Sequence, residues 1–197
     1  MSDSASNASS SSSSLVIDFP AWVDELVAAF QGSLVDDESR MALTLRLSEE
    51  NVARGGGPFA STVFLAERFV AAGVNRVLES GFSIAHAEIV ALMRAQALLG
   101  KEAAVTAPPL TLFASTEPCC QCFGALVWAG VRGLVCGATT ADAEAVGFDE
   151  GPKPEDWVAV LERRGISVQQ GVQRAEAERV LRGYVARGGT IYGKPEL

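Results

Sequence analysis

The stretch LTLFASTEPCCQCFGALVWAG, residues 110–130, passes from a run of β-type side chains into an apolar helix within a few positions. Residues 110–114 predict a strand, and residues 119–129 predict a helix that begins at the cysteines. Further strands are expected over 133–137 and 166–170, and further helices over 155–164 and 174–187. Strands that alternate with helices pair in parallel, with helices on both faces of the sheet, so this part of the chain predicts an α/β fold.

The residues before 110 predict three more helices and a hairpin. The helices are expected over residues 20–30, 37–54 and 86–99. Two β-type runs, 59–65 and 68–78, are separated so briefly that an antiparallel hairpin is the natural join. The expected architecture is a three-layer α/β/α fold with a mixed sheet of about five strands, of which the first hairpin is antiparallel.

The length and the N-terminal composition predict the domain organisation. The chain has 197 residues, which suits one domain and is too short for two full-sized cores. Its first fourteen residues, MSDSASNASSSSSS, include nine serines and no aromatic or branched aliphatic side chain, so nothing there offsets the entropy lost on ordering. We therefore expect a disordered serine-rich tail over residues 1–14 and a single domain over residues 15–197.

The charge balance and the hydropathy indicate which partners the protein binds and in which compartment it works. With 24 acidic and 16 basic residues the net charge is −8, which repels phosphate backbones and argues against nucleic acid as a partner. No apolar run approaches the roughly 20 residues that a membrane span needs. No lysine or arginine precedes Arg40, so the positive flank of a signal or transit peptide is missing. We expect a cytoplasmic protein that acts on a small molecule and contacts no membrane.

The chain has one histidine, His86, and four cysteines. One histidine excludes a two-histidine metal triad, a bis-histidine haem and a Cys2His2 finger within a single chain. In a reducing compartment four cysteines rarely form a disulfide framework, and a close Cys-x-x-Cys pair points to metal or redox chemistry. A zinc site in this chain would therefore bind the metal mostly through sulfur.

Two short motifs lie where loops become helices: His86-Ala87-Glu88, and the pair Cys119 and Cys122. One predicted strand separates the two helices, so a right-handed crossover can bring both helix starts to one edge of the sheet. The two cysteines, three residues apart, share a helix face, and the positive helix end favours their thiolate forms. One nitrogen and two sulfurs leave the fourth tetrahedral position for water, as in a catalytic zinc site. Glu88 can reach the same cavity and handle protons there.

These motifs resemble the H-x-E and P-C-x-x-C signature of the zinc-dependent cytidine-deaminase-like superfamily. Further segments are similar to bacterial guanine deaminases of that fold, in particular to the type that also accepts ammeline, a triazine. The segments are GGPF at 56–59, NRV at 75–77, EPC at 117–119, CFGA at 122–125 and AVGFDE at 145–150. The resemblance covers most of the chain from about residue 37 to its end.

The resemblance implies a cytidine-deaminase-like fold and a zinc aminohydrolase that acts on a free purine-type base, converting guanine to xanthine and ammonia. It implies Zn²⁺ as the cofactor, bound by His86, Cys119 and Cys122. It also implies a homodimer, in which the C-terminal segment can lie near a neighbouring active site.

The resemblance further implies roles for residues around the metal. Glu88 would take the proton of the attacking water and pass it to the ring of the base. Glu150 would act as a second acid, with Asp149 as the alternative for that role. Asn75 would bind the edge of the base.

Phe59 or Trp128 would supply a stacking surface for the base, although Trp128 is also expected to lie in the core. The backbone amide of Ala87, close to a helix start, would orient the substrate. Two positions depart from the family pattern: Gln121 replaces the methionine usual before the second cysteine, and Thr116 stands where a small residue is common. A polar amide near the zinc would change how the exocyclic groups of the base are read.

Three other functions are compatible with the motifs. The nearest is deamination of another heteroaromatic amine, such as ammeline or another triazine, cytosine, a pterin or a nucleoside. A tRNA adenosine deaminase shares the pattern E-P-C-x-x-C-x-G-A, but the net charge of −8 and the acidic stretch 142–155 disfavour a tRNA surface. A non-catalytic, zinc-stapled binding module would not need Glu88 beside an open coordination position.

Overall fold

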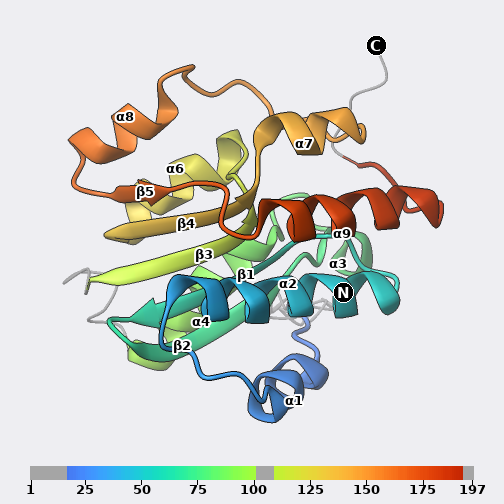
Figure 1. Ribbon diagram of the computed structural model, residues 1–197, viewed down its shortest axis with the longest axis horizontal. Helices are drawn as coiled ribbons and strands as arrows, with labels where there is room; N and C mark the ends of the chain where they lie inside the picture. The colour runs from blue at the N-terminus through green and yellow to red at the C-terminus, as the bar shows by residue number, and fades with distance from the viewer. Residues whose placement is uncertain (1–16, 101–108, 193–197) are drawn as a thin grey trace, which may run out of the picture.

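Five strands form one mixed sheet in the order β2-β1-β3-β4-β5 (Figure 1). The computed structural model describes residues 17–100 and 109–192, so the tail expected over 1–14 lies outside the described residues. The strands are β1 (Ala60–Leu65), β2 (Arg68–Val74), β3 (Leu110–Thr116), β4 (Gly133–Ala138) and β5 (Ser167–Gln169). The pairs β3–β4 and β4–β5 are parallel, as the alternation of strands and helices after residue 110 predicts.

The hairpin of β1 and β2 is antiparallel, with Ala60 opposite Val74, as expected. β1 also pairs antiparallel with β3 and so joins the hairpin to the parallel half of the sheet. The expectation that the second strand reaches residue 78 is wrong, because β2 ends at Val74. The Asn75 side chain accepts a hydrogen bond from the Val77 N–H (3.1 Å), and the chain turns there into the short helix α3 (Val77–Ser80).

Helices cover both faces of the sheet. They are α1 (Ala21–Ala29), α2 (Asp37–Ala53), α4 (Ala87–Leu99), α6 (Cys120–Ala129), α7 (Thr140–Ala145), α8 (Trp157–Arg163) and α9 (Arg174–Ala186). Helices α4 and α6 lie on one face of the sheet, and α2 and α9 lie on the other (Figure 1). Successive β3 side chains point to opposite faces: Leu112 and Ala114 pack in the cluster with α4 and α6, and Phe113 packs with α2 and α9. This arrangement confirms the three-layer α/β/α architecture. None of these helices of the described chain is long and apolar enough to cross a membrane.

Two helices besides α3 differ clearly from the sequence-based expectation. α7 was not expected, because its six residues are too few to show an apolar period. It begins with a capping box, in which Thr139 Oγ1 accepts from the Asp142 N–H (3.2 Å) and Asp142 Oδ2 accepts from the Thr139 N–H (2.8 Å). α8 begins at Trp157, two residues later than expected.

The helices α4 and α6 begin at the same edge of the sheet. His86 is the N-cap of α4 and Cys119 is the N-cap of α6, and both residues have extended backbone. α4 also lies directly on β2 at Gly73, where a Cβ atom would lie 2.4 Å from the backbone nitrogen of Ala91. The absence of a side chain at Gly73 therefore sets how closely the helix that follows His86 approaches the sheet.

Candidate active site

His86, Cys119 and Cys122 bring one nitrogen and two sulfur atoms together at this edge. His86 Nδ1 lies 3.4 Å from Cys119 Sγ and 3.6 Å from Cys122 Sγ, and the three ligand atoms all lie within 4.8 Å of one another. Zinc bonds of about 2.0–2.1 Å to nitrogen and about 2.3 Å to sulfur, at a tetrahedral angle, place such atoms roughly 3.6 Å apart. The donor set and its spacing therefore fit Zn²⁺.

The local fold projects two of these ligands from helix starts. The Val90 N–H donates to the His86 carbonyl (2.9 Å), and the Phe123 N–H donates to the Cys119 carbonyl (2.8 Å), which are the first bonds of α4 and α6. The side chains of His86 and Cys119 therefore stand just outside regular helix. Cys122 lies one turn into α6 and is buried.

Hydrogen bonds among the three side chains separate the protonation states of the two thiols. Hydrogen bonds from Cys122 and His86 lower the pKa of Cys119 to about 4. The same contact with Cys119, together with burial, raises the pKa of Cys122 well above its ordinary value. Burial lowers the pKa of His86, but the hydrogen bond to Cys119 and nearby negative charges outweigh it and raise the pKa overall. A bound cation would therefore displace protons from this cluster.

A cavity of about 60 Å³ opens next to His86 and Cys119. Of the other residues proposed from the sequence, five line it: Phe59, Asn75, Glu88, Glu150 and its alternative Asp149. Cys122 and Ala87 lie beside it without lining it. Ala87 occupies the first position of α4, so its N–H has no partner within the helix. Residues far apart in the sequence thus meet at one concave site.

Two buried carboxyl groups face the cavity. Glu88 is 8% exposed, and burial, followed by the negative charge of Cys119, raises its pKa. Glu150 is 6% exposed, and burial, with the nearby charges of Cys119 and Glu88, raises its pKa to about 8. Its neighbour Asp149 also lines the cavity but is exposed, and its Oδ1 accepts a hydrogen bond from the Gly151 N–H (2.8 Å). Burial therefore distinguishes the two candidates for the second acid.

Asn75 is fixed at the cavity wall by three hydrogen bonds. Its side-chain Oδ1 accepts from the Val77 N–H. Its backbone N–H donates to the Phe59 carbonyl (3.0 Å), and its backbone carbonyl accepts from Asn51 Nδ2 (3.1 Å). The side chain is almost completely buried. The two backbone bonds fix the position of the residue, and the bond from Val77 holds its side-chain amide with the Nδ2 end turned away from Val77.

Aromatic rings form the apolar side of the cavity, and two of them were missed from the sequence. Phe59 meets Phe148 edge to face, with centroids 4.8 Å apart, and Phe148 meets Tyr192 edge to face at 5.6 Å. Tyr192 comes from the C-terminal end of the described chain, and its hydroxyl is buried without a hydrogen-bond partner among the described residues. The segment GFDE carried a signal for Phe148, but nothing local marked Tyr192.

Two expectations about α6 are wrong. Trp128 belongs neither to the core nor to the cavity: it is 88% exposed, because α6 buries the face of Cys122 and Leu126, and Trp128 lies about 200° around the helix from Leu126. Gln121 does not reach the zinc cluster either. Its Nε2 donates to the Ile84 carbonyl (3.3 Å) outside the cavity. Thr116, the other departure from the family pattern, does line the cavity.

Comparisons with known proteins agree with this geometry. The family described as the cytidine and deoxycytidylate deaminase zinc-binding region matches residues 34–138. The structure of guanine deaminase from Nitrosomonas europaea is similar with a TM-score of 0.81 and 44% identity, over 88% of this chain and 97% of that one. A solved mutant chain in complex with 8-azaguanine gives a TM-score of 0.82 at 44% identity, over 89% of this chain and 98% of that one.

Among curated relatives, guanine deaminase from Bacillus subtilis (strain 168) is 33% identical over 59% of this chain and 73% of its own length. The family match at residues 34–138 spans all three proposed zinc ligands, His86, Cys119 and Cys122. The chain therefore belongs to the zinc-dependent cytidine and deoxycytidylate deaminase family, as a guanine-deaminase-like aminohydrolase.

Proposed function

We propose that this protein hydrolyses guanine to xanthine and ammonia, with one water consumed for each ammonia released. The observation that carries the proposal is the pair of buried carboxyl groups, Glu88 and Glu150, in the cavity that also holds the His86, Cys119 and Cys122 cluster. The likeness to guanine deaminases over nearly nine-tenths of the chain supports guanine over other amines. Zinc bound by the cluster would supply the Lewis acidity that lowers the pKa of water to about 7.

Glu88 is the proton carrier in this proposal. It accepts the proton of the attacking water and passes it to the ring nitrogen next to the carbon that bears the amine. That transfer avoids a build-up of negative charge on the ring. A carboxyl group can do both tasks best when its pKa lies near the working pH, and burial moves the pKa of Glu88 in that direction.

Glu150 is the second acid. Burial is the main cause that raises its pKa to about 8, and it favours the protonated carboxyl, which can donate a proton to the departing amine. Asp149 remains the alternative, but it is exposed and its carboxylate already accepts from the Gly151 N–H. Of the two side chains, burial and protonation favour Glu150.

The remaining cavity residues bind the base. Asn75 donates from Nδ2 to an acceptor on the edge of the base, because its Oδ1 is occupied by Val77. Phe59 offers its ring as a stacking surface, held edge to face by Phe148. The N–H of Ala87, at the start of α4, donates to the substrate.

The test is ammonia release from guanine, ammeline, cytosine, adenine, a pterin and their nucleosides, each with zinc-loaded protein. We expect the highest kcat/KM with guanine. A higher value with ammeline or cytosine would reassign the substrate while keeping the reaction. No ammonia from any amine, with zinc bound, would favour the non-catalytic binding module.

We also propose that two copies associate through the outer side of α4 and α6. Large apolar side chains are exposed there, including Trp128 and Met93, with Ile84 just before α4. Size-exclusion chromatography with light scattering should give twice the chain mass for wild type. The variant Trp128→Arg should give the mass of one chain. Val35→Arg, at another exposed apolar side chain, is the control. A monomeric wild-type protein would contradict the proposal.

Two further parts of the proposal concern the surroundings of the protein. None of the four cysteines of the described chain forms a disulfide, which supports a cytoplasmic location, where cysteines stay reduced. The net charge of −8 supports a small-molecule partner and argues against nucleic acid.

A further inference from the structure

The segment that carries Glu150 is tied to the turn that carries Cys119. The Glu150 carbonyl accepts from the Cys120 N–H (2.9 Å). Three residues later, Lys153 Nζ donates to the Pro118 carbonyl (2.7 Å) and to Thr140 Oγ1 (2.7 Å). The segment 150–153 is therefore joined to this turn at Pro118 and at Cys120, the two neighbours of Cys119. Only the bond to Pro118 comes from a side chain, that of Lys153.

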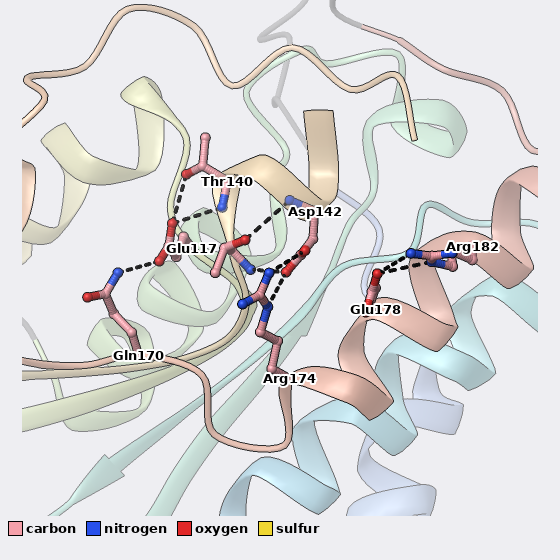
Figure 2. A network of polar contacts seen from close by, with 8 residues as sticks. Glu117, Thr140, Asp142, Gln170, Arg174, Glu178 and Arg182 are labelled. Carbon is pink, nitrogen blue, oxygen red and sulfur yellow. Dashed lines mark hydrogen bonds and ion pairs between the residues drawn. The ribbon is translucent and has the colours of Figure 1, made fainter. Parts of the chain in front are cut away.

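The acceptor hydroxyl of Thr140 is itself fixed. It donates to Glu117 Oε2 (2.9 Å), and the Thr140 N–H donates to the same oxygen (2.8 Å). Gln170 Nε2 donates to the other oxygen of Glu117, which is buried (Figure 2). Since the Thr140 hydroxyl proton is given to Glu117, its lone pair faces Lys153. The bonds form a directional chain from Lys153 through Thr140 to Glu117.

An ion pair between exposed Arg174 and buried Asp142 anchors this chain at the start of α7. Arg174 holds Asp142 at the start of α7 through two bonds of 2.8 Å each (Figure 2). Thr140 lies in the first turn of the same helix. The stem of Lys153 is half-buried, with its ammonium 4.9 Å from the centre of the Trp157 ring. The ammonium group is thus held from both sides, although its two hydrogen-bond acceptors are uncharged.

We propose that Lys153 is a positioning residue that holds the Glu150 segment against the Cys119 turn, so that the second acid keeps a fixed place relative to the zinc ligands. The charge of Lys153 also lowers the pKa of Glu150, but its two hydrogen bonds go to a backbone carbonyl and a hydroxyl and so fix the position of the segment. The inference rests on the proposed role of Glu150. It concerns the distance between acid and metal ligands, to which turnover is sensitive: a displacement of about 1 Å can cost about a hundredfold in rate.

The test compares Lys153→Met, which keeps the length of the stem, with Arg54→Met as a matched control. Arg54 also lies over a tryptophan ring, at 4.9 Å from the centre of Trp22, and also makes a hydrogen bond, to Glu50, but it lies away from the cavity. Hydrogen exchange at the Cys120 amide is the first readout, because that N–H donates to Glu150. We expect exchange about 10- to 100-fold faster in Lys153→Met and unchanged in Arg54→Met.

The second readout is a double-mutant cycle with Glu150→Gln. If Lys153 acts through Glu150, Lys153→Met lowers kcat about 10- to 100-fold, with KM and zinc content little changed, and lowers it no further in the Glu150→Gln background. Additive losses would mean a general structural role and would overturn the inference. Thr140→Val keeps the side-chain volume and loses the hydroxyl, so it should speed hydrogen exchange at the Cys120 amide, but less than Lys153→Met does. Thr140→Ser keeps the hydroxyl, so Cys120 should exchange at the wild-type rate.

The outcomes separate the two proposals. Unchanged Cys120 exchange in Lys153→Met overturns the inference whatever the enzyme does. Faster exchange in a protein that releases no ammonia from guanine keeps the positioning role and removes the proposed function.

Discussion

Glu88→Gln isolates the carboxyl group that we place at the centre of the reaction. The substitution preserves the shape and removes the proton-carrying oxygen. Glu88 lies two residues after His86 in the first turn of α4, is 8% exposed and faces the cavity. The amide also avoids the cost of burying a charge, so the thermal midpoint should be unchanged or slightly higher.

The expected loss of rate follows from the role of this group. General acid–base catalysis by one positioned group contributes about 10²- to 10⁴-fold, or about 3–5 kcal/mol of barrier. Glu88 handles the same proton twice, once from water and once toward the ring, so we expect the upper end of that range, about 10⁴-fold. Because both transfers occur at the transition state, kcat and kcat/KM should fall together.

The assay is steady-state ammonia release with zinc measured on the same sample. Wild type and Glu88→Gln should each hold about one zinc per chain. Glu162→Gln, on the exposed side of α8, is the control and should keep the wild-type rate. A rate within a few-fold of wild type, with zinc retained, would refute the assignment of Glu88. Loss of zinc would instead make Glu88 part of the metal site.

Three further predictions test the metal site, the packing and the pH response. His86→Ala should abolish both zinc binding and turnover, since the chain has no other histidine; survival of either, measured by metal analysis and ammonia release, would overturn the zinc site. Gly73→Ala should destabilise the fold by about 1–3 kcal/mol in urea, because its Cβ meets the α4 backbone, whereas Gly183→Ala, with open space in α9, should cost nothing. The hydrogen bond from Arg174 lowers the pKa of Asp142 in the folded protein. The ionised Asp142 therefore stabilises the fold above the unfolded-state pKa of about 3.9, and this stabilisation is lost as the pH falls toward the folded-state pKa. The urea midpoint should drop less between pH 5 and pH 2.5 in Asp142→Asn than in wild type, and equal drops would contradict this role of Asp142.

Local patterns sufficed for the fold class and the metal site. The alternation of β-type runs and helical periods after residue 110 produces the parallel pairs of the sheet. His86, Glu88, Cys119 and Cys122 were identifiable because metal ligands at helix starts obey short, fixed spacings. The antiparallel contact of β1 with β3 follows from no local pattern, because β2, α3 and α4 lie between these two strands in the chain.

The sequence by itself identified the nitrogen, the two sulfurs and the carboxyl group of the site. The spacing within each motif places Glu88 beside His86 and Cys119 beside Cys122, and the predicted crossover of the sheet brings the two helix starts to one edge. Only the tertiary structure decided which groups surround that centre. It buries Glu150 and exposes Asp149, brings Tyr192 from the far end of the chain, and turns Trp128 outward. Burial depends on which elements pack together, and those contacts connect residues that no spacing along the chain relates.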